Sequence, residues 1–159
     1  MRFIVSLCFL LLASLTPLHA APSASASASG EITVENARAH PTIAGRPGVG
    51  YLKLINTSDT PRLLVSADSP AIGNIEIHNH VIDDGVARMR RIENVSIPAH
   101  GMVHFKPHGL HLMLFNPVKP LQLGDHFPVT LNFDNADSLS VTINVENRHN
   151  PHAAGHHHP

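Results

Sequence analysis

From residue 31 onward, apolar and polar residues alternate over short runs, and turn residues separate one run from the next. Successive side chains of a β-strand point to opposite faces, so this alternation predicts half-buried strands. The same part of the chain has no long helical repeat of apolar residues. Strands are expected at residues 32–35, 49–56, 63–66, 75–78, 86–92, 103–106, 110–115, 127–133 and 139–145. Many short strands with frequent turns predict an all-β fold, an antiparallel β-sandwich or barrel.

The alternation also predicts which side chains point away from the core. The three leucines within residues 110–114 share one strand face, so His111 and Met113 project together from the other face. His78 likewise lies opposite the isoleucines of residues 75–77. We therefore expect these histidines and this methionine on the outward faces of their strands, near the surface.

Histidine and methionine supply the candidate chemistry. The four candidate ligands are His78, Met89, His111 and Met113. Ten residues separate the first from the second, twenty-one the second from the third, and one the third from the fourth. Thioether sulfur is a poor ligand for hard cations and for Zn²⁺, whereas imidazole binds several first-row metals, so the mixture favours Cu(I). Met102 lies outside this set, and we expect it to pack in the core.

The start of the chain has the pattern of a secretory signal peptide. Arg2 precedes an apolar run at residues 3–12, and small residues follow up to residue 21. The alternative, an N-terminal membrane anchor, is less favoured because no second apolar segment follows, so we expect no membrane span in the mature chain. The expected organisation is a signal peptide at 1–20, an Ala/Ser-rich disordered linker at 21–30, a β-sandwich domain at 31–146 and a His-rich flexible tail at 147–159.

Composition narrows the function classes. Cys8 is the only cysteine and lies inside the expected signal peptide, so the mature chain should have no disulfide and no thiolate ligand. That excludes a blue-copper site, and because Cys8 is not at the cleavage point, no lipid-bearing cysteine is expected either. The formal charge is −1 and becomes more negative when Arg2 is removed, which excludes a nucleic-acid-binding protein.

Histidine is unusually frequent, with fourteen in the chain, and several lie in the tail. Imidazole is the commonest metal-binding side chain, so the tail predicts capture of Cu(II), Zn²⁺ or Ni²⁺. A purification remnant is the alternative, but the irregular spacing argues against it. The tail candidates are His149, His152, His156, His157 and His158.

The spacing of the four candidate ligands resembles the signature of the PCuAC family of periplasmic copper chaperones. Further segments similar to that family lie at residues 75–78, 89–90, 97–98, 106–107, 109–114, 120–121 and 123–125. The resemblance implies a cupredoxin-like Greek-key β-sandwich that binds Cu(I). It also implies transfer to apo copper sites of respiratory oxidases, chiefly the dinuclear site of cytochrome c oxidase. A thioredoxin-fold copper or thiol partner is a further candidate, and we expect a monomer.

Two positions depart from the family pattern. His80 stands where family members often carry a methionine, and His108 where glycine is frequent. His78 and His80 share a strand face, so His80 is a candidate for an additional ligand. His108 adds another imidazole near the same site. Because of these two histidines, the sequence does not fix the number of metal ligands.

Other functions also remain open. A zinc or nickel protein would use the histidines and ignore the methionines, and a copper storage or detoxification protein would bind copper without delivering it. An enzyme is not expected, because the sequence has no zinc-protease helix motif, no nucleophile elbow and no carboxylate pair tied to the motif. A purely adhesive β-sandwich would bind no metal in fixed proportion.

Overall fold

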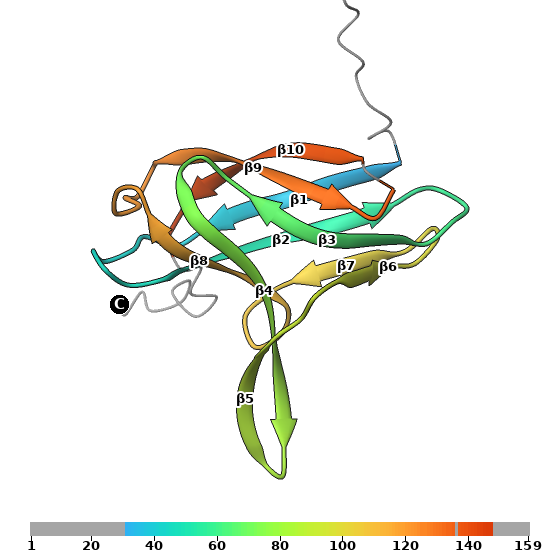
Figure 1. Cartoon of the computed structure of the whole chain (residues 1–159), viewed down its shortest axis with the longest axis horizontal. Helices are drawn as coiled ribbons and strands as arrows, with labels where there is room; N and C mark the ends of the chain where they lie inside the picture. The colour runs from blue at the N-terminus through green and yellow to red at the C-terminus, as the bar shows by residue number, and fades with distance from the viewer. Residues whose placement is uncertain (1–30, 136, 148–159) are drawn as a thin grey trace, which may run out of the picture.

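The computed structural model describes residues 31–135 and 137–147, and this part of the chain is built from β-strands (Figure 1). The strands are β1 (Ile32–Ala39), β2 (Gly48–Asn56), β3 (Arg62–Asp68), β4 (Ile72–Asp83), β5 (Val86–Arg91), β6 (Val95–Ile97), β7 (Met102–Phe105), β8 (His111–Pro117), β9 (His126–Phe133) and β10 (Ser138–Val145). Within these ranges no helix is long and apolar enough to cross a membrane.

The strands join into one continuous sheet in the order β5-β4-β8-β2-β1-β10-β9-β3-β6, and β7 pairs with β2 outside this path. In Figure 1, β10, β9 and β1 lie uppermost, β3 and β2 lie below them, and β7 and β6 lie lower still. The ladders are antiparallel except that β1 pairs with β10 in parallel. The predicted all-β, cupredoxin-like Greek-key fold is confirmed, with this one parallel ladder added.

The core is filled mainly by aliphatic side chains on alternate strand positions. The most deeply buried are Leu52, Leu54, Leu64, Ile97, Leu112, Leu114, Val129, Leu131, Ile143 and Val145. Burying such side chains stabilises the fold by roughly 1.5 to 3 kcal/mol for each. The core fixes the register of β4 and β8, because Ile77 and Leu112 are paired across these strands and both are buried.

The hairpin of β4 and β5 projects beyond the rest of the molecule (Figure 1). Asp83 pairs with Val86, so Asp84 and Gly85 make a two-residue turn. Both turn residues have positive φ, 51° and 76°, as a type I′ turn requires, and Asp-Gly is a favoured sequence for it. The sequence therefore predicted this turn. It did not predict β6, because three residues are too few to show alternation.

Asn56 connects the end of β2 to the loops that follow it and to β6. Its side chain is buried, and Nδ2 donates hydrogen bonds to the carbonyl oxygens of Thr60 (2.8 Å), Ile97 (3.3 Å) and Pro98 (3.1 Å). Its Oδ1 accepts hydrogen bonds from the backbone N–H and the hydroxyl of Ser58. One amide thus satisfies donors and acceptors from two segments, the loop at residues 58–60 and the end of β6 at residues 97–98.

Replacing this amide by a carboxylate tests its role. Asn56→Asp places an oxygen where Nδ2 now donates to three carbonyl oxygens, so the free energy of unfolding should fall by about 3 kcal/mol. Urea unfolding at neutral pH measures the loss. Asn144→Asp, on an exposed position of β10, is the control and should change the free energy by less than about 0.5 kcal/mol. Equal effects in the two variants would mean that the Asn56 network contributes little.

Candidate metal centre

His78 and His111 face each other across the β4–β8 ladder. They are a directly opposed pair in the register, and their ring centroids are 6.0 Å apart. The neighbouring pair, Ile77 and Leu112, points into the core, so the two imidazoles lie on the opposite face of the sheet. The prediction that each of these histidines lies on the strand face opposite the core residues is therefore confirmed.

His111 is buried, with 4% of its surface exposed, and this differs from the expectation of an outward, exposed ligand. The loop at residues 106–110, which joins β7 to β8, lies against this ring and contributes to its burial. The carbonyl oxygen of Gly109 accepts hydrogen bonds from the ring Nδ1–H of His111 (2.8 Å) and from the backbone N–H of His80 (3.3 Å). This loop therefore ties β4 to the ring of His111.

Each of the paired imidazoles has one nitrogen held and one nitrogen without a partner. Nε2 of His78 lies 2.8 Å from a carboxylate oxygen of Glu76, to which it donates a hydrogen bond. Nδ1 of His78 and Nε2 of His111 are both buried, and neither has a hydrogen-bond partner among the described residues. Histidine ligands of metals characteristically donate the other ring N–H to a carboxylate or a backbone carbonyl, which directs the free lone pair at the metal. The pair has this arrangement.

The charges around the pair favour neutral imidazole at His111 and an ionised carboxylate at Glu76. Burial lowers the pKa of His111, because the charged ring would lose hydration, although the hydrogen bond to Gly109 opposes this shift. The hydrogen bond from His78 lowers the pKa of Glu76, and burial partly opposes it. The Arg91 guanidinium, 3.1 Å from Glu76, lowers it further.

The two methionines of the sequence motif lie on the same face as the histidines, on either side of them. Met113 is half-buried and pairs with Glu76 across β4 and β8. Met89, on β5, pairs directly with His80, and Arg91 is the residue opposite His78. Met89 is therefore a diagonal neighbour of His78, at a typical separation of about 7 to 8 Å. It is 49% exposed.

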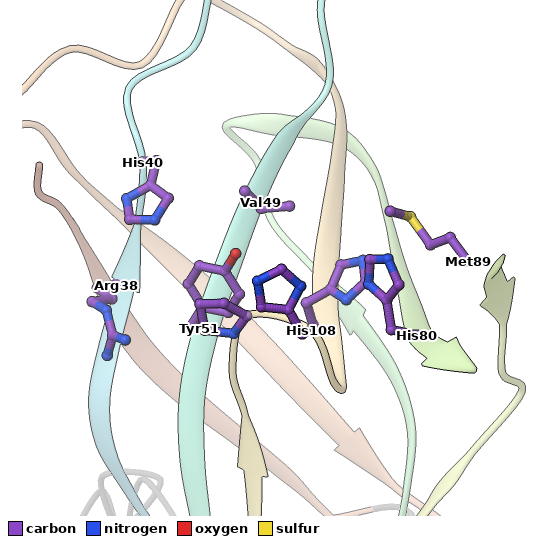
Figure 2. A pocket seen from close by; sticks show the side chains of 9 residues that line it. Arg38, His40, Val49, Tyr51, His80, Met89 and His108 are labelled. Carbon is purple, nitrogen blue, oxygen red and sulfur yellow. The ribbon is translucent and has the colours of Figure 1, made fainter. Parts of the chain in front are cut away.

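A hollow of about 330 Å³ opens beside His111. Figure 2 shows His40 and Arg38 at one end of this hollow and Met89 at the other, with His80 in between. The full lining is Arg38, His40, Val49, Tyr51, His80, Met89, Pro107, His108 and His111. The structure thus brings His80 and His108 to the site, whereas His78 and Met113 lie outside the lining of the hollow.

His108 occupies a strained position in the turn over the site. The N–H of Gly109 donates to the carbonyl oxygen of Lys106 at 3.1 Å, with Pro107 at the second position and His108 at the third. His108 has a φ of 60°. A positive φ at the third position after proline is the pattern of a type II turn, which favours glycine or asparagine there.

Another expectation was wrong. Met102 is 54% exposed on β7 rather than packed in the core, and its sulfur lies 3.3 Å from Nε2 of His104. His40, which also lines the hollow, is half-buried, and its ring lies against Tyr51. Strand parity could have indicated the exposure of Met102, because this residue alternates with the partly buried Val103.

The described part of the chain brings together no group of three or more His, Cys, Asp or Glu side chains close enough to hold a metal ion. Any metal here would therefore need methionine sulfur or side-chain movement to complete its coordination. The tail histidines and Cys8 lie outside the described residues.

Residues 32–145 match the family described as "Putative lipoprotein LpqE-like". The chain belongs to this LpqE-like family. A curated relative is an uncharacterised protein, RP573, of Rickettsia prowazekii (strain Madrid E), which is 37% identical over 98 residues. That match covers 61% of this chain and 54% of the relative, so the chain spans about half the length of that protein.

Solved structures confirm the fold of this LpqE-like protein. A copper-bound PCuAC domain from PmoF2 has a TM-score of 0.63 and 22% identity, over 75% of this chain and 95% of that domain. The solution structure of Cu(I)-bound DR1885 from Deinococcus radiodurans has a TM-score of 0.58 and 26% identity, over 85% of this chain and 96% of that protein. The chain therefore has a PCuAC-like fold.

The buried His111 ring predicts how stability changes with pH. Because its pKa in the folded protein is lowered, the unfolded chain takes up the proton more readily. The metal-free protein should therefore keep its full stability above the ordinary histidine value of 6.5 and lose stability as the pH falls below it. Urea unfolding between about pH 5.5 and 8 measures this without titrating carboxylates.

His111→Asn is the control for this pH dependence. Asparagine keeps an N–H donor for the Gly109 carbonyl oxygen but cannot be protonated in this range. The slope of stability against pH should be smaller in the variant than in the wild type. An unchanged slope would show that another group causes the dependence.

The strained turn gives a second stability prediction. His108→Gly should raise the free energy of unfolding of the metal-free protein by about 1 kcal/mol, because glycine adopts positive φ without steric cost. His126→Gly, at an exposed position of β9, should instead lower it. The two midpoints of urea unfolding, measured beside the wild type, give the comparison. A loss of stability on His108→Gly would contradict the assignment of strain to this residue.

Proposed function

We propose that this protein is an extracytoplasmic copper chaperone that binds Cu(I) through His78, Met89, His111 and Met113. The observation that carries the proposal is the pair of buried ring nitrogens on facing strands, Nδ1 of His78 and Nε2 of His111, for which the described residues provide no hydrogen-bond partner. Leaving such nitrogens buried and unpaired costs about 1 to 3 kcal/mol each, which binding to a metal would offset. The copper-bound PCuAC domain and Cu(I)-bound DR1885, with their similar fold, support the proposal.

The choice of metal follows from the ligand types. Two neutral imidazoles and two thioethers are soft, and no cysteine thiolate or carboxylate belongs to the set, so Cu(I) is preferred over Zn²⁺. Glu76 lies behind His78, where its carboxylate accepts a hydrogen bond from the Nε2–H group and leaves the lone pair of Nδ1 available to the metal. Met89 has an unbranched side chain, which can turn from its place beside His80 toward His78 and His111.

Release is proposed to occur by ligand exchange at the exposed side of the site. His78 and His111 are held by hydrogen bonds, whereas Met89 is half exposed on a projecting edge strand. A partner's thiolates can replace Met89 first, because thiolates are stronger and softer donors for Cu(I) than thioethers. The metal then passes to the partner without being free in solution.

The proposed acceptor is an apo copper protein of a respiratory oxidase, with the dinuclear copper site of cytochrome c oxidase as the main candidate. A thioredoxin-fold copper or thiol partner is a second candidate, and the periplasm is the proposed location. The tail histidines are proposed to collect Cu(II). These finer proposals rest on the resemblance of the motif, His78 to Met113, to the PCuAC signature.

A second candidate function is storage of zinc, nickel or copper through the histidines. It is favoured by His80 and His108, which bring further imidazoles to the hollow beside His111. This function predicts that loss of the methionines leaves metal affinity unchanged. The chaperone function predicts that loss of the two methionines weakens Cu(I) binding.

Anaerobic Cu(I) titration against a chromogenic chelator separates the two functions. The background protein should carry serine in place of the five tail histidines, so that only the folded domain is measured. It should bind one Cu(I), and Met89→Leu with Met113→Leu should weaken the affinity on the order of 100-fold, because two of four ligands are lost. Met102→Leu, at an exposed methionine outside the motif, is the control and should bind as the background does. Equal affinity in all three proteins would exclude the proposed ligand set.

A further inference from the structure

Four imidazoles form a row that begins at the proposed Cu(I) ligands and continues beyond them. The ring centroids of His78 and His111 are 6.0 Å apart, those of His111 and His80 are 6.1 Å apart, and those of His80 and His108 are 5.9 Å apart. The proposed function uses the first two rings and leaves His80 and His108 without a role. These two rings lie over the hollow, which His78 does not line.

The nitrogens of His80 and His108 are free to bind a ligand. Within residues 31–135 and 137–147, neither ring makes a hydrogen bond or an ion pair. The two residues come from β4 and from the turn at residues 106–109, which the hydrogen bond from the His80 N–H to the Gly109 carbonyl oxygen holds together. The backbone therefore holds the two residues close together, and the side-chain rotamers set the separation of the two rings.

The distance between the rings fits one metal ion between them. A metal–nitrogen bond is about 2.0 Å long, and a ring nitrogen lies about 1 Å from the centroid of its ring. Two imidazoles that share a metal therefore have centroids about 5 to 6 Å apart. The 5.9 Å between His80 and His108 is within this range. Small rotations about the side-chain torsions would bring one nitrogen of each ring toward the same point.

We propose that His80 and His108 form a second metal site, for a borderline divalent cation, beside the Cu(I) site. Imidazole binds such ions well, and among first-row divalent ions Cu(II) forms the strongest complexes with nitrogen ligands. Because the hollow is open and has a volume of about 330 Å³, water can complete the coordination. The two sites share no ligand, so both can be filled at once. This inference rests on the proposed function in assigning His78, Met89, His111 and Met113 to Cu(I).

The surroundings set the strength of the second site. Among the described residues, no carboxylate lines the hollow, and Arg38 contributes a positive charge at its far end. A divalent ion would therefore keep most of its charge near a guanidinium, which lowers its affinity. We expect the second site to bind Cu(II) more weakly than the first site binds Cu(I).

Separate titrations with Cu(II) in air and with Cu(I) under anaerobic conditions test the proposal. Both use the background protein with serine at the five tail positions, and electron paramagnetic resonance reports nitrogen ligands of Cu(II). His80→Asn with His108→Asn should weaken Cu(II) binding at least about tenfold and change Cu(I) affinity by less than about threefold. Asparagine at position 108 tolerates positive φ, so the turn is preserved.

Two control variants make the result specific. His100→Asn with His126→Asn removes two exposed histidines outside the hollow and should leave both affinities unchanged. Met89→Leu with Met113→Leu should weaken Cu(I) binding on the order of 100-fold but keep Cu(II) binding within about threefold. Urea midpoints show that each variant is folded, and His108→Asn alone provides the test if the double variant is not.

Cu(II) binding that survives His80→Asn with His108→Asn would overturn the proposal. A parallel loss of Cu(I) binding in that variant would overturn it too, because it would place all four histidines in one site. Failure of the proposed Cu(I) function would give a different result from failure of the second site. In that case Met89→Leu with Met113→Leu would bind Cu(I) as the background does, whatever happens to Cu(II).

Discussion

The candidate site depends on how two facing imidazoles satisfy their hydrogen bonds. Both nitrogens of a buried imidazole need a hydrogen-bond partner or a ligand. One nitrogen of His78 donates to Glu76, and one nitrogen of His111 donates to the Gly109 carbonyl oxygen. The remaining nitrogens, Nδ1 of His78 and Nε2 of His111, are buried and have no hydrogen-bond partner in the described part of the chain. An unpartnered buried acceptor is costly, and a ligand bound at these nitrogens would offset that cost. The β4–β8 ladder and the turn at residues 106–109 are both needed to hold it.

Much of this could be predicted from residue patterns. Alternation in β8 places Leu112 and Leu114 in the core and His111 on the other face, since side chains two apart share a face. The Asp84-Gly85 turn could be predicted as well, because few sequences accept positive φ at two successive residues. Both features depend only on neighbours in the sequence.

Other features depend on contacts that no local pattern encodes. The burial of His111 arises because the turn at residues 106–109 folds over β8, and the pairing of Met89 with His80 arises from the register of the hairpin. A shift of that register by two residues would bring Met89 opposite His78 with no change in alternation. Spacing along the chain therefore selects the ligand types, whereas the register decides which of them are direct neighbours.

The proposed site joins two ligands held by hydrogen bonds and one exposed ligand, and this division suits the proposed transfer. The two imidazoles are fixed by strand pairing and hydrogen bonds, while Met89 lies exposed on a projecting edge strand. If all four ligands were rigid and buried, a partner could not begin to replace them, and if all were mobile, the metal would be lost to solvent.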